Sequence, residues 1–167
     1  MNSASDRTCA IMAAVLVEQA LQQAFETHLE ESSILDTSTG KQELFFAQGA
    51  PLGTFKNRIL MGWAMGFYDE ATAKDLELIR DIRNQFAHSL LALDFANEHI
   101  IKTCSQIRDY EFEFPDRDDV APARLVYEKA CWHITMDLSR LALAKLRVRV
   151  EQLHNILREH GVEVPAL

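Results

Sequence analysis

The sequence predicts an all-α fold, a single-domain helical bundle in which the first and last helices are the longest. Near both ends of the chain, apolar residues recur every three or four positions over many turns, which is the spacing of one face of a helix. Residues that cap or break helices separate these stretches. The 167 residues, 48% of them hydrophobic, are enough for one domain spanning residues 1–167 to bury its own core.

Five helices are expected, at residues 5–31, 55–67, 70–90, 95–107 and 122–158. The first four start at side chains that can accept a hydrogen bond from the free N–H groups of a first turn: Ser5 or Asp6, Thr54, Asp69 and Asp94. Pro122 suits the first turn of the last helix because its missing N–H costs nothing there, and Gly161 ends that helix. Between the helices, residues 32–41 predict a polar loop that precedes a short apolar piece, and residues 109–114 predict a short extended segment.

The net charge and the cysteine pattern disfavour some functions and indicate a cellular compartment. The formal net charge is −8, which disfavours direct DNA binding and attachment to a membrane surface, because both draw on Lys and Arg. No uninterrupted apolar run approaches the ~20 residues of a membrane span. The three cysteines, Cys9, Cys104 and Cys131, are widely spaced and form no C-x-x-C pair, which is typical of free thiols in a reducing compartment. We therefore expect a cytoplasmic protein with no membrane segment.

Three segments of the first two thirds of the chain carry recognisable motifs. They are Ser5-Asp6-Arg7; Gly49-x-Pro51-Leu52-Gly53-Thr54-Phe55; and Asp75-Leu76-x-x-Ile79-Arg80-x-Ile82-Arg83-Asn84-x-Phe86-Ala87-His88, followed by Phe95 and Cys104. Together they resemble the mannitol operon repressor (MtlR-like) family over roughly residues 5–107. The sequence departs from the family pattern at Ala50, which interrupts a Gly-Pro pair, and at Lys56-Asn57-Arg58, which is bulkier and more basic than expected.

The resemblance implies an all-α protein that controls transcription without a DNA-binding motif, through contacts with other proteins. The implied partner is a DNA-binding regulator or a component of a sugar-phosphotransferase system, and a homodimer is compatible with the sequence. No cofactor is implied. The motif positions that the resemblance singles out are Asp6, Arg7, Pro51, Thr54, Arg80, Arg83, Asn84 and His88.

A helix-turn-helix is the obvious feature to seek in such a regulator, and residues 60–78 do contain a helix, a turn near Gly66 and a second helix. The exposed start of that second helix carries four carboxylates, Asp69, Glu70, Asp75 and Glu77, against one lysine, Lys74. Carboxylates repel a phosphate backbone, and this segment lacks the Arg and Asn side chains that read bases. Two packed helices of a bundle are the better interpretation.

An enzymatic alternative rests on Arg83, Asn84 and His88. Their spacing is similar to the R-x-x-x-x-H signature of HEPN nucleases, which are metal-independent ribonucleases. The resemblance would make His88 the proton-transfer residue, Arg83 the phosphate clamp and Asn84 a positioning residue. On a regular helix, however, Arg83 and His88 lie roughly 140° apart, so they converge only if the helix ends near His88 or a second subunit completes the site.

The structural interpretation is that Arg83 is a mostly buried arginine paired with a carboxylate, for which Asp6 is the candidate. Arg7 is expected to pair with an acidic residue of a neighbouring helix. The histidines and cysteines lack the spacing of a zinc site, so no metal is expected. One side of the last helix is basic, with Arg140, Lys145, Arg147, Arg149 and Arg158. It can be solvated, contact an acidic partner, or pair with the acidic segment 109–119 of a second copy.

Overall fold

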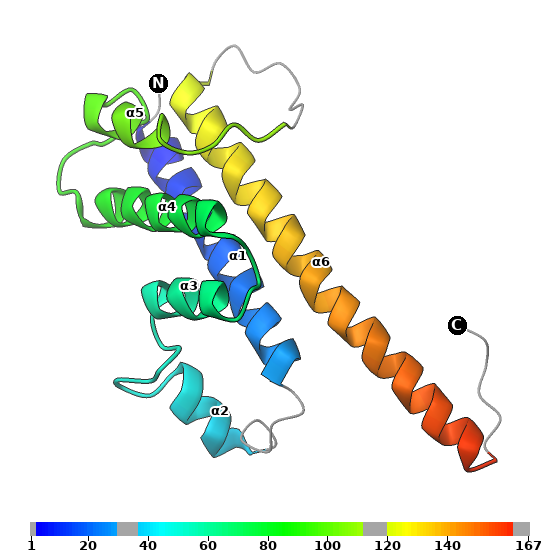
Figure 1. Cartoon of the computed structure of the whole chain (residues 1–167). Coiled ribbons are helices and arrows are strands. Elements are labelled where there is room, and N and C mark those ends of the chain that lie inside the picture. The colour runs from blue at the N-terminus through cyan, green and yellow to red at the C-terminus, as the bar shows by residue number, and fades with distance from the viewer. Residues whose placement is uncertain (1–2, 30–36, 112–119, 162–167) are drawn as a thin grey trace.

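The structure is a computed structural model that describes residues 3–29, 37–111 and 120–161. Within these residues it contains six α helices and no strand: α1 (Ser3–Leu29), α2 (Ser38–Phe45), α3 (Phe55–Ala64), α4 (Glu70–His88), α5 (Glu98–Cys104) and α6 (Pro122–Glu159). The all-α bundle is confirmed, and so are its long first and last helices, of 27 and 38 residues. Figure 1 shows α3, α4 and α5 stacked on one side of this long pair.

The core forms where α1 and α6 pack side by side and run in the same direction (Figure 1). Contacts advance together along both helices: Asp6 pairs with Arg124, and the Tyr127 hydroxyl donates a 2.7 Å hydrogen bond to the Ala10 carbonyl. Phe86 and Phe95 stack with ring centroids 4.9 Å apart and close the core from the side of α4. The core is therefore built on the first and last helices, which are the farthest apart in the sequence.

By length and composition, α1 could cross a membrane, since an 18-residue window within Ser5–Leu29 has a mean hydropathy of 1.2. Its composition has a different explanation in the bundle. Both the α4 side and the α6 side of the helix need apolar residues, and Ala10, Val17, Leu21 and Phe25 are fully buried there. A helix covered on several sides loses its polar face and becomes apolar over much of its circumference.

Three element boundaries differ from the sequence prediction. The polar loop was expected to reach residue 41, but α2 already begins at Ser38, because the Thr37 side chain accepts a hydrogen bond from the Gly40 N–H and caps it. The second expected helix ends at Ala64 instead of 67, and Gly66 follows with a positive φ of 73°. The fourth was expected to span 95–107 from a cap at Asp94. It spans only Glu98–Cys104, because Asn97 provides the cap.

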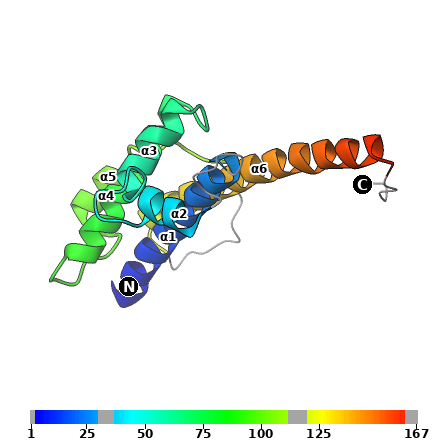
Figure 2. The ribbon, with the colours of Figure 1, turned by 90° about the horizontal axis from the view of Figure 1, so that it is seen from below.

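Two smaller differences are that α1 begins at Ser3, before both expected caps, and that α4 ends at His88 instead of 90. The other predicted caps and breaks agree with the structure. Thr54 and Asp69 cap α3 and α4, Pro122 opens α6, and Gly161 follows it with a φ of 75°. α6 is much longer than the bundle it packs on. Its second half extends well past the other helices (Figure 2), and no residue after Ala142 in the described part of α6 is fully buried.

Candidate functional site

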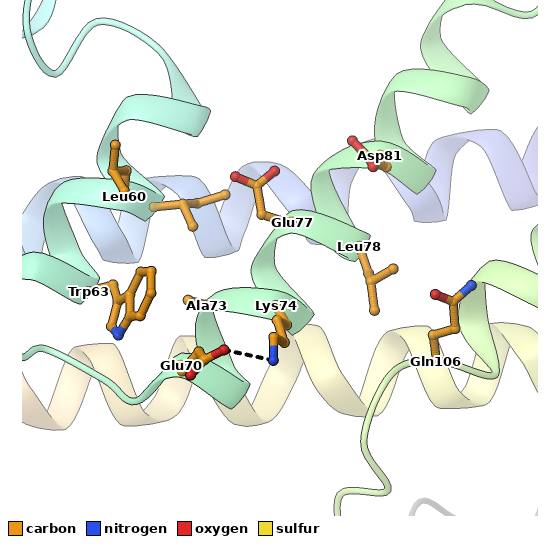
Figure 3. A pocket seen from close by; sticks show the side chains of 10 residues that line it. Leu60, Trp63, Glu70, Ala73, Lys74, Glu77, Leu78, Asp81 and Gln106 are labelled. Carbon is orange, nitrogen blue, oxygen red and sulfur yellow. Dashed lines mark ion pairs between the residues drawn. The ribbon is translucent and has the colours of Figure 1, made fainter.

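The candidate site is a groove between α3 and α4 with a volume of about 470 Å³ (Figure 3). It is lined by residues of both helices and by one residue that follows α5: Ile59, Leu60, Trp63, Glu70, Ala73, Lys74, Glu77, Leu78, Asp81 and Gln106. We call it the α3–α4 groove. Its floor is apolar and its rim is charged, which is the usual composition of a site that binds an amphipathic segment.

The apolar floor comes from the orientation of α3. Phe55, Ile59 and Gly62 face the bundle, so Leu60 and Trp63 point away from the core and stay 62% and 44% exposed. Tyr68 fixes this orientation: its hydroxyl donates a 2.8 Å hydrogen bond to the Ile59 carbonyl and lies against Gly62. A Cβ at position 62 would overlap the Tyr68 ring, so only glycine allows this approach.

The rim is acidic because α4 presents three carboxylates along the groove. Lys74 pairs with Glu70 at 2.8 Å, as Figure 3 shows. Arg80, which lies outside the groove lining, pairs with Glu77 at 2.8 Å and Asp81 at 2.9 Å. These are exposed or half-exposed pairs that exchange easily with other cations. The lining itself carries three acidic residues and one lysine, so the groove favours a basic ligand.

The structure places Arg83 against α1 and not against Asp6, so the expected Asp6–Arg83 pair is wrong. Arg83 lies 3.4 Å from one oxygen of Glu18, and Arg58 lies 3.3 Å from the other. Arg83 is only half-buried. The buried guanidinium is that of Arg58, whose side chain is 7% exposed and also donates to the Leu52 carbonyl. One carboxylate therefore joins three helices, α1, α3 and α4.

Arg58 is not among the residues predicted from the sequence, because Lys56-Asn57-Arg58 departs from the family pattern. The spacing did contain a signal: Arg58 follows Phe55 by three positions and precedes Gly62 by four, which places it on the buried face of α3. Burial lowers the pKa of the Arg58 guanidinium, and the carboxylates of Glu18 and Glu26 act in the opposite direction.

Asp6 is buried inside α1 and is not its cap. Its carboxylate pairs with Arg124 of α6 at 2.8 Å and accepts a 3.1 Å hydrogen bond from the Phe95 N–H. Arg7 was expected to pair with an acidic residue. Its guanidinium instead donates to the carbonyls of Ser89 and Leu91, at 2.6 and 3.2 Å. These two motif residues therefore tie the start of α1 to α6 and to the segment that follows α4.

The three residues of the enzymatic alternative occupy different environments. Arg83 faces Glu18, Asn84 is half-buried, and His88 is exposed in the last turn of α4. Among the described residues, the structure records no hydrogen bond or ion pair between Arg83 and His88. α4 does end at His88, as convergence would require, but the guanidinium is held on the side of α1.

The remaining motif positions are structural or exposed. Thr54 accepts a 3.1 Å hydrogen bond from the Asn57 N–H, and Pro51 lies exposed in the turn before it. Asp75, at the start of the third motif, is buried and accepts hydrogen bonds from Arg108 Nε and the Tyr110 hydroxyl, both at 2.7 Å. Burial and the bond to Asp75 raise the pKa of Tyr110. The sequence does not predict this cluster, because Asp75 lies more than 30 positions from Arg108 and Tyr110.

The expected extended segment at 109–114 and the acidic run to 119 lie mostly outside the described residues, which end at Glu111 on this side. In the described ranges, no group of three metal-ligating side chains comes together. Comparisons with models of known protein families, with curated proteins and with solved structures found no match to this chain. The surface of the molecule, above all the α3–α4 groove, is therefore the guide to its function.

Proposed function

We propose that this protein is a cytoplasmic transcription regulator that acts by binding another protein, and that the α3–α4 groove is its binding site. The observation that carries the proposal is the exposure of Leu60 and Trp63 beside an acidic rim. The occupant is a basic amphipathic helix of the partner. The resemblance to mannitol operon repressors supplies the regulatory setting and the two partner classes, a DNA-binding regulator or a sugar-phosphotransferase component.

The physical case for such an occupant has two parts. Burying a leucine or an aromatic side chain contributes about 1.5–3 kcal/mol, so covering Leu60 and Trp63 supplies a central anchor. A helix laid in a groove offers apolar residues on one side and charges on the flanks. Lys and Arg on those flanks meet Glu70, Glu77 and Asp81, which selects basic over acidic segments.

The same charges argue against direct DNA recognition by these two helices. A helix that enters a DNA groove needs cations at its N-terminus to approach the phosphates. The first turns of α4 carry Asp69 as the cap and Glu70 after it, with Lys74 already paired to Glu70. A protein partner that itself binds DNA gives the chain a route to transcription without such contacts.

The first test measures peptide binding in the groove. Trp132→Phe leaves Trp63 as the sole tryptophan, and its fluorescence reports on the groove. A synthetic amphipathic helix with leucines on one side and lysines on its flanks is titrated against it, beside the same peptide with glutamates for lysines. We expect a blue shift with the basic peptide alone, since Trp63 moves from water into an apolar contact.

Matched variants decide whether that binding uses the groove. Leu60→Asp adds a charge in the groove and is expected to weaken binding at least about tenfold, because the charge must be buried under the peptide. Leu90→Asp adds the same charge at a fully exposed leucine outside the groove and should leave binding unchanged. Equal binding of both peptides, or an unaffected Leu60→Asp variant, would contradict the proposal.

The regulatory part is tested in cells by comparing transcript levels of sugar-alcohol uptake genes. The Leu60→Asp strain should behave like a deletion strain, and the Leu90→Asp strain like the wild type. In parallel, the purified protein is incubated with RNA without metal. We expect intact RNA. Cleavage that disappears in His88→Ala would replace this proposal with the ribonuclease alternative.

A further inference from the structure

A second apolar surface runs along α6 and is separate from the α3–α4 groove. Its members alternate in spacing by four and three positions over nearly four heptads, and we call them the α6 stripe: Trp132, Met136, Ser139, Leu143, Leu146, Val150, Leu153 and Leu157. Only Ser139 is polar. This alternation is the a and d pattern of a coiled coil, in which one helix packs its seam against another helix.

Most of the α6 stripe faces away from the bundle. The side of α6 that packs on the other helices contains Tyr127, Ile134, Leu138 and Ala142, all buried. With about 100° of rotation per residue, the stripe lies roughly 130° away from that side. Leu143 is accordingly 56% exposed. In Figures 1 and 2 the second half of the helix projects past the bundle, and Leu153 near its end is 50% exposed.

The bundle end of the stripe borders an apolar hollow between α1 and α6. This hollow has a volume of about 410 Å³ and is lined by Cys9, Met12, Leu16 and Trp132, among others. Met12 and Leu16 are each 54% exposed although they lie on the central helix of the fold. One continuous apolar surface therefore extends from the hollow on the bundle to the projecting end of α6.

We propose that this surface binds a second copy of the chain in an antiparallel dimer, with a two-fold axis between residues 144 and 145. The spacing of the stripe reads the same in both directions. Reversing it about that axis places Leu157 on the partner's Trp132, Leu153 on the partner's Met136, Val150 on the partner's Ser139 and Leu146 on the partner's Leu143. Every layer then joins an a position to a d position, as antiparallel packing requires.

In this dimer the projecting half of each α6 covers the hollow of the other copy. Leu157 and Leu153 of one copy meet Trp132 and Met136 of the other, and Trp132 lies beside Met12 and Leu16 of α1. Met12, Leu16 and the most exposed side chains of the α6 stripe together present roughly 700 Å² of apolar surface per copy, close to the ~800 Å² per partner of a standard-size interface. Those stripe side chains are Trp132, Leu143, Leu146, Val150, Leu153 and Leu157. The contact uses the same patch on both subunits, so it closes into a dimer and does not propagate.

The basic side chains beside the α6 stripe give a second copy and an acidic partner opposite dependences on salt. Arg140 and Arg147 flank it at equivalent heptad positions, so in the dimer Arg140 lies near the partner's Arg147. Exposed like charges of this kind oppose association weakly and are screened by salt. The dimer must therefore become tighter as ionic strength rises. An acidic partner on the same surface would bind more weakly under those conditions.

The test is the mass of the full chain in solution, measured by sedimentation equilibrium across protein and salt concentrations. We expect twice the 19.0 kDa of the chain at micromolar concentration, with a dissociation constant that falls from 0.05 to 0.5 M salt. Leu146→Asp and Leu153→Asp change exposed positions, so the bundle still folds, and each should raise the dissociation constant at least about 100-fold. Leu90→Asp is the matched control and should stay dimeric. A monomer at all concentrations overturns the proposal.

The orientation is tested with spin labels on single introduced cysteines at two exposed positions of α6. Labels on Ala144→Cys lie within about 20 Å of each other in any paired arrangement of the two helices. Labels on Asn155→Cys lie more than about 30 Å apart in the antiparallel dimer, from the helical rise of ~1.5 Å per residue. Short distances at both positions would show a parallel pair and overturn the register.

This inference does not rest on the proposed function, because the two surfaces share no residue. Leu60→Asp should remain dimeric, and Leu153→Asp should still bind the basic peptide. Failure of one experiment therefore leaves the other intact.

Discussion

At the scale of single residues, the side chain of Glu18 is shared by two arginines. Its two oxygens pair with Arg58 of α3 and Arg83 of α4, so one carboxylate of α1 contacts both helices. A buried guanidinium without a carboxylate is costly, and Arg58 is the more buried of the two arginines. Glu18 therefore decides how α3 and α4 sit on α1, and with them the width of the α3–α4 groove.

We expect Glu18→Gln to lower the free energy of unfolding by about 2–4 kcal/mol, because it removes the charge that compensates the buried Arg58. Arg83→Gln should cost less than half as much, since the Arg83 side chain is 27% exposed and that of Arg58 only 7%. Urea denaturation followed by circular dichroism measures both. Equal losses for the two variants would show that burial of Arg58 is not the cause.

The buried thiols predict a loss of stability in alkaline solution. Burial raises the pKa of Cys9 to about 12, with a further contribution from its hydrogen bond to Glu128, and burial raises that of Cys104 to about 12. Below pH 9 the two thiols keep their protons in both the folded and the unfolded protein. Between pH 9 and 12 the unfolded chain loses them while the folded protein retains them, so stability falls as pH rises, by up to about 1.4 kcal/mol per pH unit for each thiol.

Urea denaturation at pH 7.5, 9 and 10.5 checks this dependence. The double variant Cys9→Ala with Cys104→Ala should show a distinctly shallower decline than the wild type between pH 9 and 10.5. Its stability at neutral pH is the baseline for the comparison. Parallel slopes in the two proteins would assign the alkaline loss to other groups.

At the scale of elements, α4 is positioned from both ends by side chains of other segments. At its start, Asp75 holds Arg108 and Tyr110, which follow α5. Past its end, Arg7 of α1 donates to the carbonyls of Ser89 and Leu91. A cation near the C-terminus of a helix is also favourable to its dipole. The floor and rim of the groove therefore depend on contacts outside it.

Arg7→Ala should destabilise the protein by about 1–2 kcal/mol, because two carbonyls lose a charged donor. The effect should be local. Amide hydrogen exchange is expected to speed up most in residues 86–92, while α3 and the middle of α6 keep their protection. Arg7→Lys retains the charge but not the forked geometry, so it should recover only part of the loss. Uniform acceleration across all helices would contradict a local role.

At the scale of the whole molecule, the sequence predicts what local chemistry determines. Thr54 and Asp69 cap their helices as expected because an N-cap needs only a side chain and the next three residues. The α2 helix was missed because its eight residues have only a weak apolar pattern. The helix predicted at residues 95–107 is longer than α5 because Asp94 and Asn97 are both good caps. In the structure Asn97 caps α5, and Asp94 accepts a hydrogen bond from the Ala96 N–H in a turn.

The candidate site could be anticipated only in part. The sequence located two packed helices at residues 60–78, and the groove lies between them. It could not show that Leu60 and Trp63 remain exposed, because this depends on Tyr68 packing against Gly62. Nor could it assign Glu18 to Arg83 and Arg124 to Asp6, because those pairs are 65 and 118 positions apart. Ion pairs between distant helices follow from the fold and not from spacing in the sequence.

The parallel packing of α1 on α6 has a consequence for how the chain is made. α1 leaves the ribosome first, and the helix that covers it begins 93 positions after α1 ends, at Pro122. At about 5–20 residues per second, the apolar face of α1 waits roughly 5–20 s for that cover. For this interval the nascent chain displays a helix apolar enough to resemble a membrane segment. We therefore expect the yield of the protein in cells to fall when ribosome-associated chaperones are absent. The stability of the folded protein should depend on them much less.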